Sequence, residues 1–585
     1  MRPSPLASAW GVFRRPPAMV RRWLLVGLLS LLIVGRVPDE AGAARGKPTG
    51  NARGPAPTVA KPGASRRAST ASGEAAPATP ARPSAERAGA TAPVLRLKVA
   101  EYATGLTFRM PQGGTWSLGG KTGRLARSDR AEVSGRLQSR ARQQYHVVVE
   151  SVPMRDPERV AAALAKWRAT GRPIHTYQAG RQSPTWDGRV LYIAAGLFPT
   201  REAAQKLVDQ LANDGQSSWI FAEPLALARG TIALTINGRR VAQGAGPLGL
   251  TPVRDLILHK VEYARGYSWH GRADRTYRGP LTIGWGAQDA LDCVLATDLE
   301  HILAGVVPSE ISSKAAPSAL QAQAVAARGE ILSKVGLRHL KEGFDFCAEQ
   351  HCQVYAGDNA VTDRIAAEIA PTRGLILHAA DGTILDAVYA ANCGGRGDRN
   401  DLVWNSQPNP HLIGVWDGPR PLALDLTDEA QVASFIRFPP FSYCQDPTVE
   451  GGDKFRWTRT LTGDAWQKVV AAAGVGRIRQ IDGLERGPSG RLYKVVIHGE
   501  KGIKTVMREL KIRQLFGGLR SACFVVAWQR DAAGFITGGE FTGAGWGHGV
   551  GMCQTGAQYL ARQGWSFDRI LLHYFPGARL VLKYR

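Results

Sequence analysis

The sequence predicts an α+β protein, and three observations support this fold class. Residues 144–226 alternate strand, helix and strand twice, which is the order of a small βαβ-βαβ layer. Residues 317–335 have the composition of a helix packed within a core. Short alternating runs separated by turns begin after residue 230, as is typical of strands. We therefore expect a small folded region at 144–226 and a larger one at 227–585.

The chain has 585 residues, of which 44% are hydrophobic, so it can build a sizeable core. Its formal net charge is +25, which favours an anionic partner such as nucleic acid, a membrane surface or a cell-wall polymer. Part of this charge lies in the N-terminal region. No nucleic-acid-binding motif is found in the sequence, so we expect no nucleic-acid partner.

The N-terminal region has the features of an export signal. Arginines precede an apolar run at 23–34, and small residues follow at 41–44, so residues 1–43 are expected to be a signal peptide or an uncleaved membrane anchor. We expect an exported protein of the periplasm or cell envelope, either secreted or membrane-anchored. Residues 44–93 are rich in Pro, Ala and Arg and are expected to be a disordered linker.

Residues 94–143 are expected to be a short β-rich segment, because residues 95–99 alternate like a strand. The region at 144–226 follows. Its expected elements are strands at 145–150, 174–177, 190–198 and 218–222 and helices at 156–168 and 201–213, the second capped by Thr200.

The run Gly-Leu-Phe-Pro-Thr-Arg-Glu-Ala-Ala at 196–204 resembles the SPOR domain, which binds glycan strands lacking stem peptides. The alternative is a scaffold of the same topology without a ligand.

The helix at 317–335 is expected to lie at the centre of the larger region. Pro317 suits the first helical position, and Leu320, Ala324, Ala327 and Ile331 share one face. Because that face is mostly alanine, a neighbouring element can approach its backbone closely.

Glu310 stands on a short segment before this helix, and Asp298 can cap the short helix that precedes Glu310. Rigid elements on both sides of a short segment can hold a catalytic group steadily. Other elements expected in the larger region are strands at 291–297, 375–378, 385–390, 493–497 and 523–528 and helices at 361–370, 558–563 and 567–574.

Three motifs resemble the stage II sporulation protein D family. They are Val-Val-Pro-Ser-Glu-Ile at 306–311, Ala-Leu-Gln-Ala-Gln-Ala-Val-Ala-Ala-Arg at 319–328 and Gly-His-Gly-Val-Gly-Met-Cys-Gln-Thr-Gly-Ala at 547–557. The family contains peptidoglycan lytic transglycosylases and proteins called amidase enhancers. The resemblance runs from about residue 277 to residue 585 and implies a mixed α/β catalytic domain.

The resemblance implies that Glu310 is the general acid and base that cleaves glycan strands to 1,6-anhydro-MurNAc ends. A hydrolase normally needs a second carboxylate. A lytic transglycosylase can omit it, because the C6 hydroxyl of the muramic acid attacks the anomeric carbon. Taken without the resemblance, a glutamate before a helix is usually a cap or a dipole partner. Glu300 could be a second carboxylate, but its place in a short helix favours a structural role.

A metal site is expected near residue 350. Cys347, His351 and Cys352 lie within six residues and His339 could supply a fourth ligand, which fits structural zinc. The alternative is a disulfide between Cys347 and Cys352, and the chain has seven cysteines in all. A metalloenzyme centred on this group is disfavoured, because four protein ligands leave no open position.

Two glycine-rich stretches are expected to line a substrate groove. The expected substrate-binding residues are Asn392, Gly394, Gly395, Trp546, His548 and Gln554. Trp546 could stack on a sugar face, and Gln554 could hydrogen-bond hydroxyl groups. His548 could orient the substrate or Glu310, or it could be structural. Cys393 and Cys553 stand where the family motifs carry hydroxyl side chains.

The sequence therefore favours an exported peptidoglycan lytic transglycosylase whose partner is the glycan strand. The alternative is a non-catalytic, peptidoglycan-binding activator whose partner is a cell-wall amidase. Both would keep the fold and the groove, and an uncleaved anchor would add the membrane as a partner.

Overall fold

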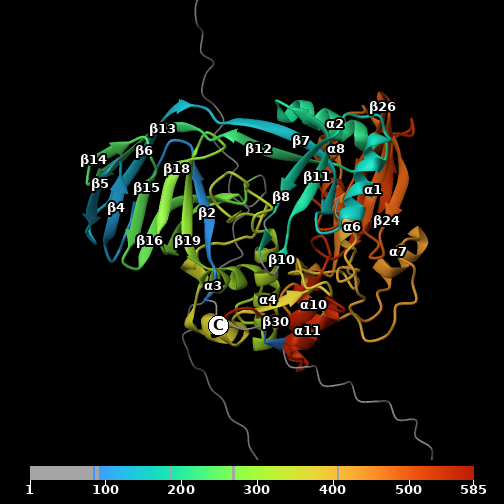
Figure 1. Ribbon diagram of the computed structural model, residues 1–585. Helices are drawn as coiled ribbons and strands as arrows, with labels where there is room; N and C mark the ends of the chain where they lie inside the picture. The colour runs from blue at the N-terminus through green and yellow to red at the C-terminus, as the bar shows by residue number, and fades with distance from the viewer. Residues whose placement is uncertain (1–83, 86–90, 181, 184–185, 266–269, 405–406) are drawn as a thin grey trace, which may run out of the picture. The chain divides into compact units, whose positions relative to one another are not determined.

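The computed structural model describes residues 84–85, 91–180, 182–183, 186–265, 270–404 and 407–585 (Figure 1). The expected signal or anchor at 1–43 and most of the linker at 44–93 lie outside the described residues. Within the described part of the chain, every helix is too short or too polar to cross a membrane.

Two β-sheets share one hydrophobic core (Figure 1). The six-stranded sheet has the order β14-β13-β6-β3-β16-β17, and the seven-stranded sheet has the order β20-β2-β19-β18-β15-β4-β5. The strands of the first sheet are β3 (Gly105–Arg109), β6 (Ala131–Ser139), β13 (Arg229–Ile236), β14 (Arg239–Gly244), β16 (Asp255–Tyr263) and β17 (Gly271–Arg278). Those of the second are β2 (Val94–Tyr102), β4 (Gly114–Leu118), β5 (Lys121–Leu125), β15 (Leu248–Pro252), β18 (Leu281–Trp285), β19 (Leu291–Asp298) and β20 (Phe346–Cys347). In β3, Leu106 and Phe108 are buried between exposed neighbours, as expected for a strand with one face in the core.

The expected boundary after residue 143 does not separate two β regions. β6 pairs with β13 and β2 pairs with β19, so residues 94–139 and 229–298 form the same two sheets. The small α/β unit at 142–226 is therefore an insertion between β6 and β13. The alternation of apolar residues predicts strands locally, but it does not specify which distant strand will be the partner.

The inserted unit has the predicted βαβ-βαβ order. Its elements are β7 (Arg142–Pro153), α1 (Pro157–Arg168), β8 (His175–Ala179), β9 (Gln182–Ser183), β10 (Trp186–Asp187), β11 (Val190–Phe198), α2 (Arg201–Asn213) and β12 (Trp219–Ala226). The sheet order is β12-β7-β11-β8. Thr200 caps α2 as predicted, since its hydroxyl accepts the N–H of Ala203 at 3.2 Å. These elements do not test the likeness to a SPOR domain, which stays a prediction.

The two faces of this sheet pack differently. α1 and α2 cover one face with a core that includes Trp167 and Leu211. The opposite face carries aromatic side chains, among them Tyr177 and Phe221, whose ring centroids lie 4.9 Å apart. This aromatic face packs against Leu337 and Leu340, which follow the central helix of the larger region. The face is therefore partly covered within the chain, and Tyr177 and Phe221 keep some exposed surface.

The central helix is α4 (Pro317–Lys334), as predicted, with Pro317 in its first turn. Leu320, Ala324 and Ala327 have no exposed surface. α4 contacts α3 (Leu299–Glu310), α5 (Asp363–Ile369), α10 (Gln554–Arg562) and α11 (Phe567–Tyr574). Glu310 is the last residue of α3 rather than part of a connecting segment, because α3 continues through Pro308 for longer than the sequence indicated.

A three-stranded sheet lies beside α4. It has the order β1-β30-β21, formed by β1 (Ser84–Ala85), β21 (Leu375–His378) and β30 (Arg579–Leu582). The expected strand at 385–390 is reduced to β22 (Tyr389–Ala390), which pairs in parallel with β29 (Met552–Cys553). The expected helix at 558–563 begins earlier, at Gln554, because Cys553 provides its N-cap.

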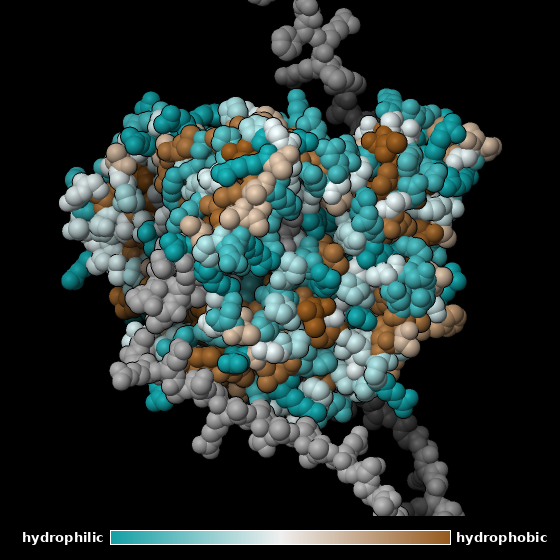
Figure 2. All heavy atoms as spheres, turned by 45° about the vertical axis from the view of Figure 1, so that its right-hand side comes forward, coloured by the Kyte–Doolittle hydropathy of each residue, from teal (hydrophilic) through white to brown (hydrophobic). Residues whose placement is uncertain are grey.

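The rest of the C-terminal region builds a separate core around Trp466 and Phe541. Its strands are β23 (Arg456–Leu461), β24 (Ile478–Arg486), β25 (Leu492–Gly499), β26 (Gly502–Met507), β27 (Phe524–Arg530) and β28 (Ile536–Ala544). The helices are α6 (Asn400–Val403), α7 (Glu429–Arg437), α8 (Gly463–Ala473) and α9 (Glu509–Leu515), and single 3-10 turns lie at Asp358–Ala360, Ala370–Thr372, Tyr443–Gln445 and Gly452–Lys454. On the face drawn in Figure 2, hydrophobic side chains form separate groups between hydrophilic ones.

Candidate active site

Glu310 lies where the C-terminal end of α3 meets α4 and two loops. Asp298 caps the N-terminus of α3 as predicted, since its carboxylate accepts the N–H of His301 at 3.0 Å. The Glu310 Oε1 atom accepts a hydrogen bond from Gln353 Nε2 at 2.9 Å. The Gln554 side chain is close enough to lower the pKa of this carboxyl group, and its Nε2 atom donates to Gln323 Oε1 at 3.3 Å. The residue keeps some contact with solvent. Glu310 is therefore held by the Gln353 amide, has Gln554 nearby and can still be reached from outside.

Burial and, to a smaller extent, the nearby charge of Glu330 raise the pKa of the Glu310 carboxyl to about 8. Hydrogen bonds from Gln353 and Gln554 oppose this shift of the pKa because they stabilise the carboxylate. At neutral pH most molecules thus hold Glu310 in its protonated form. A carboxylic acid of this kind can protonate a leaving oxygen.

Glu330, which the sequence reasoning missed, is a second acidic group near Glu310. It lies on α4 and pairs with Lys334 one turn later, at 2.5 Å. Burial raises the pKa of Glu330 as well. A charged residue on a helix made mostly of alanine was the signal that could have revealed it, since such a position costs stability unless it is paired.

A chain of side chains connects Glu310 to His548. The Tyr389 hydroxyl donates to Gln353 Oε1 at 2.6 Å, which leaves the Gln353 amide N–H directed at Glu310. The same hydroxyl lies in hydrogen-bonding range of Glu330. His548 hydrogen-bonds the backbone of Tyr389. Neither Gln353 nor Tyr389 was predicted from the sequence, because each is brought to Glu310 by a loop without a motif of its own.

His548 is a neutral residue in this arrangement. Its Nδ1 atom accepts the N–H of Val550 at 3.0 Å. Burial and the charges of Arg491 and Arg513 lower the pKa of His548 to about 3. Its ring also contacts that of Trp404, with 4.8 Å between centroids. His548 therefore positions its neighbours and does not exchange protons near neutral pH.

The structure does not support direct substrate binding by Asn392. Its side chain has no exposed surface, and Nδ2 donates to the carbonyl oxygens of Cys444 at 2.9 Å and Gly451 at 3.0 Å. The Asn392 amide satisfies these two backbone carbonyl groups, which lie in loops without regular backbone pairing. Asn392 thus holds loops together.

Gly394 and Gly395 are also buried, so they do not line an open groove. Both have positive φ angles, of 80° and 110°. A side chain at Gly394 would lie 2.9 Å from the backbone nitrogen of Gly545, so the glycine permits close approach of two loops rather than of a ligand.

Trp546 is partly exposed and its ring has cationic neighbours. Lys454 lies 5.0 Å and Arg520 lies 4.9 Å from the ring centroid. Stacking of Trp546 on a sugar stays a prediction. Among the expected substrate-binding residues, the structure brings Gln554 directly to Glu310 and His548 to it through Tyr389 and Gln353.

The four residues expected to bind metal are brought together. The ligand atoms of His339, Cys347, His351 and Cys352 all lie within 4.8 Å of one another. His339 Nε2 is 3.2 Å and His351 Nδ1 is 3.4 Å from the Cys352 sulfur, and the two sulfurs are not joined. His339 Nδ1 bonds the Glu342 carboxylate at 3.0 Å, which directs Nε2 at the centre of the group. Two thiols and two imidazoles of this geometry fit a tetrahedral zinc ion.

Glu300 is structural. Both of its carboxylate oxygens accept hydrogen bonds from the Arg328 guanidinium, at 2.9 and 2.8 Å, and the Tyr584 hydroxyl donates to Oε1 at 2.6 Å. Arg328 has no exposed surface, so Glu300 balances a buried cation on α4.

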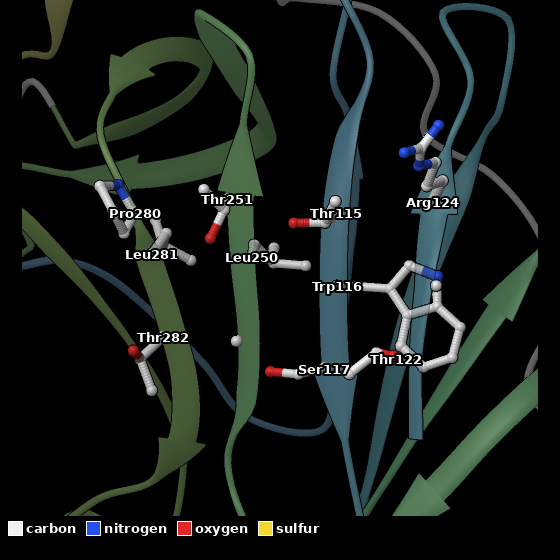
Figure 3. Close-up of a pocket in the computed structure, with 12 residues that line it drawn as sticks. Thr115, Trp116, Ser117, Thr122, Arg124, Leu250, Thr251, Pro280, Leu281 and Thr282 are labelled. Carbon is white, nitrogen blue, oxygen red and sulfur yellow. The ribbon is translucent and has the colours of Figure 1, made fainter. Parts of the chain in front are cut away.

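An open hollow lies on the seven-stranded sheet, away from the predicted site residues (Figure 3). Thr115, Thr251 and Thr282 line it from three neighbouring strands, with Arg124 at one side. None of the residues around Glu310 contributes to it. The hollow therefore does not belong to the candidate active site.

Two family models match the chain. Residues 287–378, which include Glu310 and the four candidate zinc ligands, match the stage II sporulation protein family SpoIID. Residues 398–551, which include His548, match a domain of unknown function (DUF8618).

Three curated proteins are similar over about half of the chain. The stage II sporulation protein D of Bacillus amyloliquefaciens is 29% identical over 48% of this chain and 73% of its own length. The protein of the same name from Bacillus subtilis is 28% identical over 48% of this chain and 74% of its own length. The amidase enhancer of Bacillus subtilis is 27% identical over 48% of this chain and 40% of its own length. The matched residues 287–378 of the stage II sporulation protein family thus hold both Glu310 and the candidate zinc ligands.

Proposed function

We propose that the protein is an exported lytic transglycosylase that cleaves peptidoglycan glycan strands with Glu310 as general acid and base. The observation that carries the proposal is the environment of Glu310, where burial keeps the carboxyl protonated near neutral pH and Gln353 orients it. A protonated carboxylic acid in reach of solvent is what cleavage of a glycosidic bond requires. The similarity to stage II sporulation protein D and to an amidase enhancer supports a role at the cell wall.

The proposed reaction uses one carboxyl group twice. Glu310 donates its proton to the bridging oxygen as the bond from that oxygen to C1 of MurNAc breaks. The C6 hydroxyl then bonds to C1 and returns its proton to the Glu310 carboxylate. The products are a 1,6-anhydro-MurNAc end and a GlcNAc residue with a free 4-hydroxyl, so the acid is regenerated. The amides of Gln353 and Gln554 stabilise the carboxylate between the two steps.

A zinc ion at His339, Cys347, His351 and Cys352 is part of the proposal. Four protein ligands leave no open position, so the ion would be structural and supply no group to the reaction. Its place in the chain gives it an indirect role, since Cys352 immediately precedes Gln353. A zinc ion that holds Cys352 in place would thereby also hold the neighbouring Gln353, whose amide contacts Glu310.

The second candidate function is a non-catalytic activator of a cell-wall amidase. The similarity to the protein named amidase enhancer favours it. An activator would need the wall-binding surface but not the protonated Glu310, so the two functions differ in their dependence on this side chain.

The experiment is digestion of purified glycan strands with the wild-type protein and Glu310→Gln, followed by mass spectrometry of the products. We expect the variant to lose release of anhydro products by at least about 100-fold, because glutamine keeps the shape but has no transferable proton. Glu349→Gln is the matched control, since Glu349 is an exposed carboxylate in the nearby zinc loop. Wild-type rates from a folded Glu310→Gln protein would refute the assignment of Glu310.

A further inference from the structure

Four buried side chains from distant parts of the chain form a second potential metal site. The ligand atoms of Cys393, Asp417, Cys444 and Cys553 all lie within 4.8 Å of one another, and all four residues are buried. Cys393 follows β22, Asp417 lies in a loop, Cys444 lies in the 3-10 turn Tyr443–Gln445, and Cys553 ends β29 and caps α10. None of these residues belongs to the group around Cys352.

We propose that these residues bind a second structural zinc ion through three thiolates and one carboxylate. The Cys393 sulfur lies 3.5 Å from the Cys444 sulfur and 3.4 Å from Asp417 Oδ2. In a tetrahedral site with zinc–sulfur bonds of about 2.3 Å, two sulfurs are separated by about 3.8 Å. The observed spacing is therefore close to that of one mononuclear ion, and binding it requires loss of the three thiol protons to solvent.

Hydrogen bonds around the group orient it as a ligand set. The Cys553 sulfur accepts the N–H groups of Cys393 at 3.2 Å and of Gly556 at 3.4 Å. The Tyr574 hydroxyl donates to Asp417 Oδ1 at 2.8 Å, so Oδ2 is left directed at the thiol of Cys393. Outer hydrogen bonds of this kind fix the orientation of metal ligands.

Nearby cations offset the negative charge of the proposed site. Three thiolates and a carboxylate exceed the charge of Zn²⁺ by two, which is costly in a buried place without compensation. Arg491 donates to the Cys393 carbonyl at 3.0 Å, and Arg456 donates to the Gly394 carbonyl at 2.9 Å. Two arginine side chains thus lie beside this group and bring positive charge to it.

The second site has the same relation to Glu310 as the first. Cys553 immediately precedes Gln554, just as Cys352 immediately precedes Gln353. Gln353 donates a hydrogen bond to Glu310, and Gln554 is the second amide close to its carboxyl group. Each zinc ion would therefore anchor one of the two side chains that position the carboxyl group. The presence of the metal does not depend on whether Glu310 cleaves glycan.

The test is the zinc content of the purified full-length protein by elemental mass spectrometry. We expect about two zinc ions in the wild type and about one after either Cys444→Ser or Cys352→Ser, because each variant removes a ligand of one site. Cys293→Ser is the control, since Cys293 is a buried cysteine outside both groups, and it should retain two. A zinc content that Cys444→Ser leaves unchanged would overturn the proposal.

X-ray absorption spectroscopy of the wild-type protein gives a second test, which does not depend on the folding of a variant. Occupation of both sites predicts an average of about 2.5 sulfur neighbours per zinc, whereas the first site alone predicts about two. An average of two sulfurs with one zinc per chain would refute the second site. A disulfide between any two of Cys393, Cys444 and Cys553, found by peptide mapping without reduction, would do the same.

Discussion

At the scale of single residues, the protonation of Glu310 follows from its neighbours rather than from its position in the sequence. The carboxyl group is enclosed by α3, α4 and two loops, and the negative charge of Glu330 lies nearby. Lys334 partly neutralises that charge, so Glu330 alone does not determine the pKa of Glu310. The largest cause of the raised pKa is burial.

The raised pKa makes stability depend on pH. The folded protein holds the Glu310 proton up to a pKa of about 8, whereas the unfolded chain releases it near about pH 4.3. The protonated Glu310 therefore makes its full contribution to the free energy of unfolding below about pH 4.3. This contribution is lost as the pH rises toward 8, because the unfolded chain then gains stability by releasing the proton. Glu310→Gln lacks this loss, so its melting temperature relative to the wild type should rise by about 1–3 °C between pH 5 and pH 8. A difference in melting temperature that is the same at both pH values would contradict the raised pKa.

At the scale of elements, two short strands and one helix end bring the site together. β22 pairs with β29, so Tyr389 on β22 and Gln554, which follows β29 as the first residue of α10, are brought near Glu310. α3 supplies the acid at its last residue, and α4 supplies Glu330. Each glutamine that contacts Glu310 is next to a cysteine of a potential zinc site, so local structure at the two clusters controls the geometry of the acid.

Tyr389→Phe tests this positioning. Without the hydroxyl, the Gln353 amide is free to turn and present its oxygen to Glu310, which favours the protonated acid. We expect kcat to fall by about 10- to 100-fold and the alkaline limb of the pH–rate profile to move to higher pH, with zinc content unchanged. Tyr493→Phe, on β25, is the control. An unchanged kcat and pH profile would show that Tyr389 does not position the acid.

Much of the local structure at this scale could be predicted from the sequence. Capping residues and periodicity placed α1, α2, α4 and α11 to within about two residues, because these signals are local. Motif resemblance drew attention to Glu310 and spacing to the group around Cys352, and the roles of both stay predictions. Tyr389 and Glu330 were missed because their importance arises from contacts between elements far apart in the chain. Asn392 was misjudged, since a polar residue in a glycine-rich loop can equally well hold that loop together.

At the scale of the whole molecule, the order of elements along the chain hid the arrangement of the two β regions. Strands before and after the inserted unit complete the same two sheets, and pairing at this distance has no local signature. Residues near the group around Cys352 pack on the aromatic face of the inserted unit, and Lys341 forms a 2.6 Å ion pair with Glu223 of that unit. Glycan binding by this unit stays a prediction.

The central claim is that Glu310 cleaves glycan strands without using water. The most direct measurement is mass spectrometry of peptide-free strands digested by the wild-type protein in H₂¹⁸O. The account predicts 1,6-anhydro-MurNAc ends that are lighter than hydrolytic ends by one water and contain no ¹⁸O. Reducing ends labelled with ¹⁸O would instead show hydrolysis with a second carboxylate such as Glu330, and intact strands would show that the protein is not a transglycosylase.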